Sequence, residues 1–294
     1  MWLVIIIPTY NRRNFLTKLL SQIKRQLLLL NVNIKVVVVN DGSSDCTEEI
    51  LIKNFNEVNI IKGDGNWWYT KSMNEGFKYA IENFNPDFFL TLNDDLELDE
   101  KYLDSMINSV NVIGNERIVG SLSLTAELPR RVTSSGVYKK NNIFGKSYSY
   151  HKFLEIVDLD KLKGLHKSIM LPGRGMLIPA KILIDLDYFD EKFPQYHSDI
   201  DFCLRAIKKG YKLFVNWDAK LYSYYKETSI SSSYQRKSLA TFLKSFSDIH
   251  SRNHLLQNMR LFWRHYNKIA FPLLIIIFSL TKVKHFLKIK FQNA

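Results

Sequence analysis

The fold is organised around residues 88–99, which read FFLTLNDDLELD. They begin with a short, mainly apolar run, and such a run bounded by a polar cluster predicts a buried strand. Asn93, Asp94 and Asp95 follow the run directly. Because ligands of open α/β sheets bind at the carboxyl ends of the strands, this cluster is the first candidate for a binding site.

Two interpretations of the Asn-Asp-Asp cluster stay open. Neighbouring carboxylates repel each other unless a cation lies between them and a phosphate group, and oxygen ligands in that setting suit Mg²⁺ or Mn²⁺. Asn and Asp also form turns and cap helices, so the cluster could simply lead from the strand into a helix. The remainder of the chain decides which interpretation is favoured.

The composition is that of a globular protein. The chain has 294 residues, 46% of them hydrophobic and 24% charged, which is enough for one large domain or two fused halves. Its two cysteines, Cys46 and Cys203, lack CxxC spacing, so no disulfide framework or zinc site is indicated and a reducing cytosol is expected. The first apolar run is too short for a signal peptide or a membrane span and predicts a strand.

The net charge of +12 is concentrated near the C-terminus. Residues 226–294 contain 12 Lys and Arg but 2 Asp and Glu, a net of +10, which leaves +2 for the first 225 residues. A protein that holds nucleic acid needs a basic surface on its body. We therefore expect no nucleic-acid partner for the N-terminal body.

Strands alternate with helices in the first hundred residues. Apolar runs and helical spacing predict strands at 3–7, 34–39, 58–61 and 88–92, and helices at 15–27, 47–55 and 72–84. Such alternation is typical of βαβ units with right-handed crossovers and a mostly parallel sheet. The predicted fold class is therefore α/β.

Polar residues follow three of the predicted strands. The chain lacks both Gly-x-Gly-x-x-Gly after its first strand and the phosphate-cradling Gly-x-x-x-x-Gly-Lys-[Ser/Thr] loop. Instead, the first strand ends in PTYN at 8–11 and the second in NDGS at 40–43. Together with residues 93–95, these groups could hold the base, ribose and diphosphate of one nucleotide.

Three stretches in this order resemble one family. PTYNR at 8–12, VVVNDGSSD at 37–45 and LNDD at 92–95 are similar to the motifs of the large second family of nucleotide-sugar glycosyltransferases, which implies the GT-A fold. GNWW at 65–68 and MNEG at 73–76 look like the branch that builds bacterial surface polysaccharides such as capsule and O-antigen. The resemblance covers residues 3–225 and implies flanking helices on a central sheet.

The resemblance implies a donor site and a metal. It places Thr9 and Asp41 against the nucleoside, Asp94 against the donor sugar or ribose, and Asp95 on a Mn²⁺ or Mg²⁺ that bridges the diphosphate. The remaining donor-binding assignments are Pro8, Tyr10, Asn11, Asn66, Trp67 and Asn74. Trp67 could instead fill the interface between sheet and helix. The family's usual acidic residue is replaced by Asn93, and a histidine often found after a later strand is missing, so fewer protein ligands to the metal are expected.

The second half of the chain is expected to hold the acceptor. Residues 119–166 are irregular, which indicates hairpins and a surface excursion, and such a region lines the acceptor site in this family. Residues 169–178 predict two short strands about a Gly-Arg-Gly turn, where backbone can approach a ligand closely. Arg174 could pair with a phosphate or with a nearby carboxylate. The acceptor-binding assignments are Gly173, Arg174, Gly175 and His197.

Asp199 is the candidate catalytic residue. It lies at the start of an amphipathic helix, where it could serve only as a cap or as a favourable charge. Asp199-Ile200-Asp201 with Arg205, however, resembles the family's acidic motif, whose first Asp acts as general base in inverting members. Ser198 stands where an acidic residue commonly precedes that Asp, so we expect less repulsion and a lower pKa for Asp199.

These features predict a metal-dependent, hexosyltransferase-like enzyme that inverts the anomeric carbon. It would move a sugar from a nucleoside diphosphate sugar to a hydroxyl of a glycan. A sugar-nucleotide nucleotidyltransferase is one alternative, although the basic Gly-rich loop that it needs is absent. A non-catalytic module that binds anionic lipid or nucleic acid is another, and the presence of Asp95 together with Asp199 argues against it.

The chain is expected to divide into a nucleotide-sugar-binding half (1–98), an acceptor-binding and catalytic half (99–225) and a basic, apolar C-terminal extension (226–294). In the extension, a helix is expected from Ser251, with Arg260, Arg264 and Lys268 beside its apolar face. Residues 269–280 are apolar but fewer than the about 20 residues that span a bilayer.

Three roles for the extension stay open: packing on the body, contact in a homodimer, and binding to an anionic membrane surface. We favour membrane binding, because lysines flank the apolar segment on both sides. The enzyme would then be cytoplasmic and peripheral on the inner face of the plasma membrane, near a lipid-linked saccharide acceptor.

Overall fold

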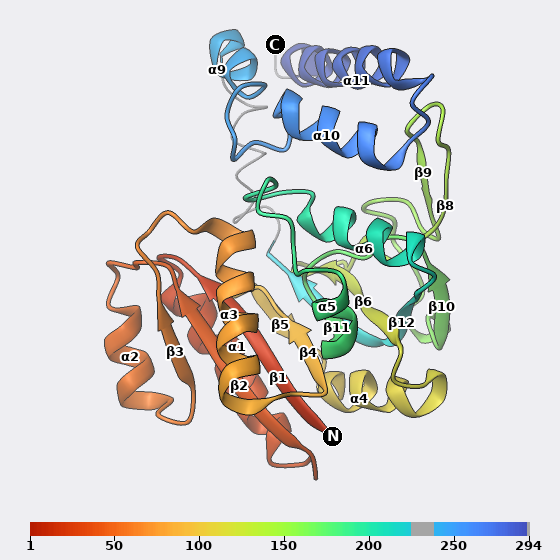
Figure 1. Ribbon diagram of the computed structural model, residues 1–294. Helices are drawn as coiled ribbons and strands as arrows, with labels where there is room; N and C mark the ends of the chain where they lie inside the picture. Colours follow the sequence, from red (N-terminus) through yellow and green to blue (C-terminus); the bar gives the residue numbers. More distant parts are fainter. Residues whose placement is uncertain (225–237, 293–294) are drawn as a thin grey trace.

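The computed structural model describes residues 1–224 and 238–292, and a mixed sheet lies at its centre (Figure 1). Its strands are β1 (Trp2–Thr9), β2 (Asn33–Asn40), β3 (Asn59–Lys62), β4 (Phe88–Thr91), β5 (Leu96–Leu98), β6 (Arg117–Thr125), β7 (Val132–Ser134), β10 (Leu165–Ser168), β11 (Met176–Pro179) and β12 (Lys212–Ser223). Their order is β10-β12-β6-β11-β4-β1-β2-β3, with β5 beside β12 and β7 beside β6. A separate hairpin consists of β8 (Val137–Lys140) and β9 (Ser147–Ser149).

Helices cover both faces of this sheet (Figure 1). They are α1 (Arg13–Leu27), α2 (Thr47–Asn54), α3 (Trp68–Phe84), α4 (Tyr102–Ile113), the 3₁₀ helix η1 (Leu159–Lys161), α5 (Ala180–Asp185), α6 (Ser198–Lys208), α9 (Leu239–Lys244), α10 (Leu255–His265) and α11 (Phe271–Gln292). The predicted α/β class is confirmed, and the predicted hairpin in the middle of the chain is formed by β8 and β9.

The sheet is parallel in its N-terminal half and mixed beyond it. Strands β3, β2, β1 and β4 run parallel, as expected from the βαβ pattern. Strand β11 runs antiparallel to β4 and β6, because the turn before it lies at the carboxyl end of β4, where Gly175 N donates to Thr91 O at 2.6 Å. Of the two strands expected at 169–178, the second is β11, but the first is wrong: β10 ends at Ser168 and pairs with β12, and Met170 forms only an isolated bridge to Val137.

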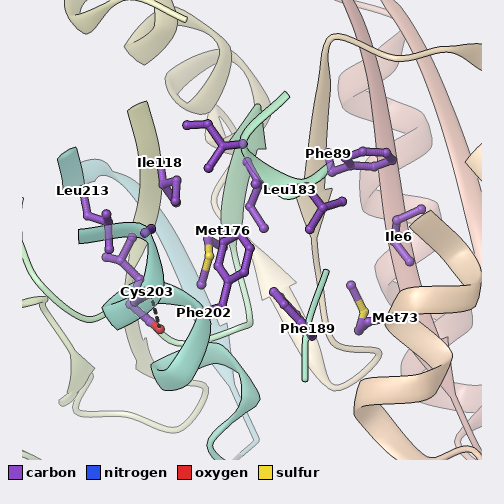
Figure 2. Close-up of a cluster of buried hydrophobic side chains, with 14 of the residues drawn as sticks. Ile6, Met73, Phe89, Ile118, Met176, Leu183, Phe189, Phe202, Cys203 and Leu213 are labelled. Carbon is purple, nitrogen blue, oxygen red and sulfur yellow. Dashed lines mark hydrogen bonds between the residues drawn. The ribbon is translucent and has the colours of Figure 1, made fainter. Parts of the chain in front are cut away.

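Two apolar layers explain the uninterrupted apolar runs in the sequence. Alternate residues of β1 enter opposite layers, with Leu3, Ile5 and Ile7 on the face of α1 and α4, and Val4 and Ile6 on the face of α3. Both faces of a parallel sheet are covered by helices, so no polar alternation appears along its strands. Figure 2 shows part of the second layer, in which side chains of α3, α5, α6 and β11 converge.

Two helices begin at other residues than the sequence predicts. Helix α3 begins at Trp68 rather than at residue 72, because the carboxylate of Asp41 accepts hydrogen bonds from Trp67 N and Trp68 N at 2.9 and 3.0 Å. Helix α10 begins at Leu255, where Nδ1 of the His254 ring accepts from Gln257 N at 3.2 Å. Ser251 is therefore not the cap, and its hydroxyl accepts from Asn253 N.

The C-terminal helices pack together against α6, with α10 between α11 and the body (Figure 1). The expected boundary between residues 225 and 226 lies outside the described residues. Among the described residues, no helix is both long enough and apolar enough to cross a membrane. Helix α11 has 22 residues but contains several lysines.

Candidate active site

The structure brings together the polar ends of β1, β2 and β4. Asp41 N donates to Thr9 O at 3.0 Å, and the Thr9 hydroxyl donates to Oδ2 of Asp94 at 2.8 Å. All three side chains are buried. Hydrogen bonds within the cluster thus fix the carboxyl edge of the parallel strands, where the sequence predicts a nucleotide.

Arg12 carries the positive charge nearest to the two carboxylates of β4. Its Nη1 lies 3.1 Å from Oδ1 of Asp94 and 3.5 Å from Oδ2 of Asp95. Burial raises the pKa of Asp94 above its ordinary value, and the charge of Asp95 raises it further, while Arg12 opposes both. No role for Arg12 was predicted from the sequence, although its position just after the first predicted strand indicates that it lies near the binding edge.

Two oxygen atoms at this edge are suited to a divalent cation. Oδ1 of Asp95 and Oδ1 of Asn93 are buried and have no hydrogen-bond partner among residues 1–224 and 238–292. Buried polar atoms are nearly always paired, and hard oxygen atoms are the ligands that Mg²⁺ and Mn²⁺ prefer. The described residues contain no group of three or more His, Cys, Asp and Glu that could hold a metal by themselves. Asp95 and Asn93 therefore fit a cation whose remaining ligands come from phosphate and water.

The Asp41 carboxylate organises the loop before α3. Besides the two tryptophan N–H groups, it accepts from Gly65 N at 2.9 Å. A Cβ on Gly63 would lie 2.4 Å from Oδ1 of Asp41, so this close approach requires glycine. Trp67 packs partly buried against the core, whereas Asn66 is exposed in the same loop.

The remaining donor-binding assignments occupy different surroundings. Pro8 pairs with Val39 within the sheet, and Tyr10 is 53% exposed. Asn11 has a left-handed backbone with φ 52° and joins two strand ends, because its Oδ1 accepts from Ser44 N at 2.7 Å. These residues lie at the predicted edge, next to Thr9.

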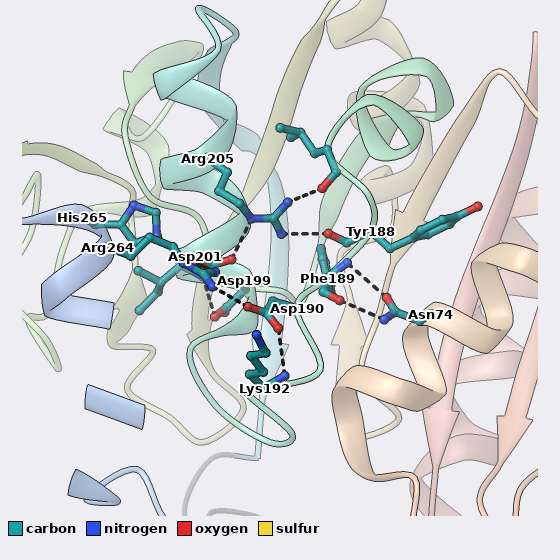
Figure 3. Close-up of polar contacts among 12 residues, drawn as sticks. Asn74, Tyr188, Phe189, Asp190, Lys192, Asp199, Asp201, Arg205, Arg264 and His265 are labelled. Carbon is teal, nitrogen blue, oxygen red and sulfur yellow. Dashed lines mark hydrogen bonds and ion pairs between the residues drawn. The ribbon is translucent and has the colours of Figure 1, made fainter. Parts of the chain in front are cut away.

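Asn74 is held inside the body instead of facing the edge. It is 3% exposed, its Nδ2 donates to Phe189 O, and its Oδ1 accepts from Phe189 N (Figure 3). Its Nδ2 also donates to Oε1 of Glu191. Both of its amide N–H groups are therefore engaged in joining α3 to the segment before α6. This geometry contradicts a donor-binding role for Asn74.

Asp199 lies on the turn formed by Gly173, Arg174 and Gly175. Its Oδ2 accepts from Gly173 N and its Oδ1 from Ile200 N, both at 2.8 Å. Burial raises the pKa of Asp199, and these two hydrogen bonds lower it less than burial raises it. The lower pKa expected from the sequence is therefore wrong: the absence of an acidic neighbour matters less than the loss of water around the carboxylate.

Hydrogen bonds from β4 and β6 also hold this turn. The hydroxyl of Thr91 donates to Gly173 O, and Ser121 Oγ donates to Gly175 O at 2.8 Å. Gly175 has φ 74°, and a Cβ there would lie 2.5 Å from Ser121 Oγ, so glycine is required. The turn thus joins the strand that leads to Asp95 directly to Asp199.

Arg174 has no carboxylate partner within 4.0 Å among the described residues. Its Nη1 and Nη2 reach only the hydroxyls of Ser223 and Thr133, at 3.5 and 3.3 Å, and its Nε is buried without a partner. The alternative that Arg174 pairs with a nearby carboxylate is therefore contradicted.

His197 precedes α6 with a left-handed backbone at φ 75°. Burial lowers the pKa of its ring to about 4, so the ring is neutral at pH 7. Its Nε2 is buried and has no hydrogen-bond partner among the described residues. The structure therefore places His197 two residues from Asp199 with one ring nitrogen available to a ligand.

Asp201 joins α6 to the C-terminal extension (Figure 3). Its carboxylate accepts from Arg205 Nε at 2.7 Å, from Arg264 Nη1 at 2.7 Å and from His265 Nε2 at 2.8 Å. Burial alone would raise the pKa of Asp201, but the hydrogen bonds from His265 and Arg205 outweigh it and lower the pKa to about 2. Arg264 therefore links α10 to α6, although its side chain stays 33% exposed.

This network leads to a prediction about stability. Because the pKa of Asp201 falls from 3.8 to about 2 on folding, its carboxylate contributes about 2 kcal/mol at pH 7, and this is lost as the pH falls from about 4 to about 2. Asp201→Asn should lower the free energy of unfolding by at least that amount at pH 7, measured by urea denaturation. Asp185→Asn, which removes an exposed partner of Lys209, is the control and should have little effect. A difference between D201N and wild type that stays constant down to pH 2 would contradict this explanation.

Solved structures share this fold, and curated proteins are similar to the chain in sequence. The structure of GalNAc-T7 with UDP, GalNAc and Mn²⁺ superposes with a TM-score of 0.59 at 13% identity, over 92% of this chain and 57% of that one. An uncharacterized glycosyltransferase of Rickettsia typhi is 27% identical over 208 residues, 69% of this chain and 58% of the relative. A Methanococcus voltae dolichyl N-acetyl-alpha-D-glucosaminyl phosphate 3-beta-D-2,3-diacetamido-2,3-dideoxy-beta-D-glucuronosyltransferase is 23% identical over 253 residues, 82% of this chain and 69% of the relative.

The central sheet with helices on both faces and polar strand ends is a GT-A fold, as the sequence predicts. The family model for glycosyl transferase family 2 matches residues 4–157, and that for glycosyl transferase family group 2 matches residues 132–289. The chain belongs to glycosyl transferase family 2. It spans 58% of the length of the Rickettsia typhi relative.

Proposed function

We propose that this chain is an inverting glycosyltransferase that moves a sugar from a nucleoside diphosphate sugar to a hydroxyl of a lipid-linked glycan in surface polysaccharide synthesis. One observation carries the proposal: a single rigid turn joins Thr91, at the strand end before Asp95, to Asp199. The strand that leads to the group for the leaving diphosphate is thereby connected through Gly173 to the group for the attacking hydroxyl. Single displacement needs both groups near one anomeric carbon.

In the proposed reaction, the donor nucleotide lies over the ends of β1 and β2, near Thr9 and Asp41. A divalent cation, Mn²⁺ or Mg²⁺, held by Asp95 and Asn93 would neutralise charge on the leaving diphosphate. Asp199 accepts the proton of the acceptor hydroxyl as its oxygen attacks the anomeric carbon from the face opposite the diphosphate. The raised pKa of Asp199 supports this role, because a base with a higher pKa takes a proton more readily.

The acceptor lies on the other side of the turn in this proposal. Arg174 and His197 each have a buried nitrogen without a partner there. The Methanococcus voltae relative is named for transfer to a dolichyl-linked sugar phosphate. We therefore propose a lipid-linked saccharide as acceptor. The test is a screen of UDP-, dTDP- and GDP-sugars for binding and hydrolysis with and without Mn²⁺, and failure of all of them to bind would refute the function.

The C-terminal extension would bring the enzyme to that acceptor. Five apolar side chains of α11 are 41–63% exposed and recur at alternating spacings of three and four, which places them in one stripe: Leu273, Ile276, Leu280, Val283 and Leu287. Residues 251–294 contain no Asp or Glu, and Lys284, Lys288 and Lys290 are exposed beside the stripe. We propose that the stripe enters an anionic membrane surface on the inner face of the plasma membrane.

Point substitutions test this better than truncation, because α10 also completes the Asp201 network. Ile276→Ser with Leu280→Ser should weaken flotation of the full chain with vesicles containing anionic lipid by about a hundredfold or more, since each buried apolar side chain contributes about 1.5–3 kcal/mol. Ile52→Ser with Val112→Ser, which removes two exposed apolar side chains of the body, should not. Unchanged flotation would contradict membrane binding, and loss of a dimer in lipid-free solution would assign the stripe to a homodimer contact.

A further inference from the structure

Arg174 is a half-buried cation that has no carboxylate within 4.0 Å among the described residues. A buried charged group is normally paired, because removal from water is costly unless an opposite charge replaces the lost hydration. Its two weak contacts are to neutral hydroxyls, and Nε has none. Burial accordingly lowers the pKa of Arg174, and the charges of Asp95 and Asp199 only partly oppose that effect.

The neighbouring carboxylates have other roles. Both oxygens of Asp199 accept backbone N–H groups, Oδ2 of Asp95 faces Arg12, and Oδ1 of Asp95 is the atom that we assign to the cation. The turn cannot move Arg174 toward them easily, because the glycines on either side are packed against Tyr69, Ser121 and Leu221. A negatively charged ligand would supply the missing partner.

Tyr69 presents a second unpartnered donor at the same turn. Its ring packs against the core and its hydroxyl is buried without a hydrogen-bond partner. A Cβ on Gly173 would lie 2.2 Å from this hydroxyl, so the absence of a side chain at Gly173 is what admits it. Tyr69 and Arg174 thus offer an O–H and an N–H donor on adjacent positions beside Asp199.

We propose that Tyr69 and Arg174 form a binding site for a phosphate oxygen of a substrate, between the Asp95 edge and Asp199. A phosphate oxygen accepts several hydrogen bonds and carries the charge that Arg174 lacks, and Arg binds phosphate through its planar set of donors. Arg252 of the extension supplies further positive charge, because it lies close enough to lower the pKa of Asp199. The phosphate belongs either to the donor diphosphate or to the lipid-linked acceptor.

The inference rests on the proposed function, and calorimetric titration of the full chain tests it. The probes are UDP, dTDP and GDP, each compared with its nucleoside. If the phosphate is the donor's, Arg174→Gln should weaken binding of the preferred diphosphate about ten- to a hundredfold and leave binding of its nucleoside unchanged, since a charge-assisted hydrogen bond is lost. If it is the acceptor's, R174Q should leave the diphosphate affinity unchanged and weaken binding of glycerol 3-phosphate to the nucleotide-saturated protein.

Three further variants separate loss of the phosphate contact from a general effect on the protein. Tyr69→Phe removes only an unpartnered hydroxyl, so it should leave the midpoint of thermal unfolding unchanged and weaken the same ligand about three- to tenfold. Arg174→Lys keeps the charge and should bind more tightly than R174Q. Arg117→Gln is the matched control, because it removes an arginine at the first residue of β6, at the end of that strand away from the turn.

The outcomes separate the two claims. If R174Q and Y69F bind the diphosphate and glycerol 3-phosphate as tightly as wild type, the phosphate site is wrong and the proposed function stands. If wild type binds none of the three diphosphates, the proposed function fails.

Discussion

Asp199→Asn abolishes sugar transfer in this account and lowers turnover by about 10³-fold or more, because general base catalysis contributes up to about 10⁴-fold. The affinity for the donor nucleotide should stay nearly unchanged, since only the attacking hydroxyl depends on this carboxylate. Turnover by wild type should fall as the pH falls through the pKa of Asp199, which burial raises above its ordinary value. Steady-state rates and nucleotide titration of the same preparations measure both effects.

The nucleotide titration also serves as the control for folding. The amide of D199N can still accept from Gly173 N or Ile200 N, so the turn keeps one of its two hydrogen bonds. Turnover of D199N within tenfold of wild type would show that another group takes the proton.

Asp95→Asn should lower turnover by about 10²-fold or more. The reason is that the cation held by this carboxylate would stabilise the charge on the leaving diphosphate by several kcal/mol. Binding of Mn²⁺ in the presence of a nucleoside diphosphate, followed by electron paramagnetic resonance, should weaken in parallel. Asp99→Asn removes a carboxylate four residues away that accepts from the Tyr222 hydroxyl and from Lys101 N, and it is the matched control. Activity that resists both chelators and D95N would contradict the assignment of the β4 end.

The strand ends could be predicted from the sequence because their signal is local. Continuous apolar runs before Thr9, Asp41 and Asp95 indicate strands with two covered faces, and parallel strands place their carboxyl ends at one edge. Asn74 shows the limit of such reasoning. Its place in a motif suggested a ligand contact, but its amide bonds to Phe189, 115 residues away, and no local pattern reports that contact.

The environment of Asp199 could not be predicted for a different reason. The sequence shows which charges are neighbours along the chain, and Ser198 correctly indicated that one was missing. It does not show how much water remains around the carboxylate, and burial is the larger effect on this pKa. Arg174 and Tyr69 are similar cases, because an unpartnered buried donor is recognised only when all neighbouring groups are placed.

The arginines of α10 illustrate how tertiary contacts change the meaning of a charge pattern. Arg260 and Arg264 recur every four residues beside the apolar face, which indicated a basic amphipathic helix. Arg264 in fact binds Asp190 and Asp201, and Arg260 Nη1 donates to Lys192 O at 2.9 Å. In α11, Lys284, Lys288 and Lys290 are exposed.

The anomeric configuration of the released sugar tests the central claim most directly. A donor that the wild-type enzyme turns over with Mn²⁺ is followed by proton NMR early in the reaction, before the free sugar mutarotates. Single displacement assisted by Asp199 predicts that the first-formed anomer has the configuration opposite to the donor, and that D199N forms it far more slowly. A first-formed anomer with the configuration of the donor would contradict the account.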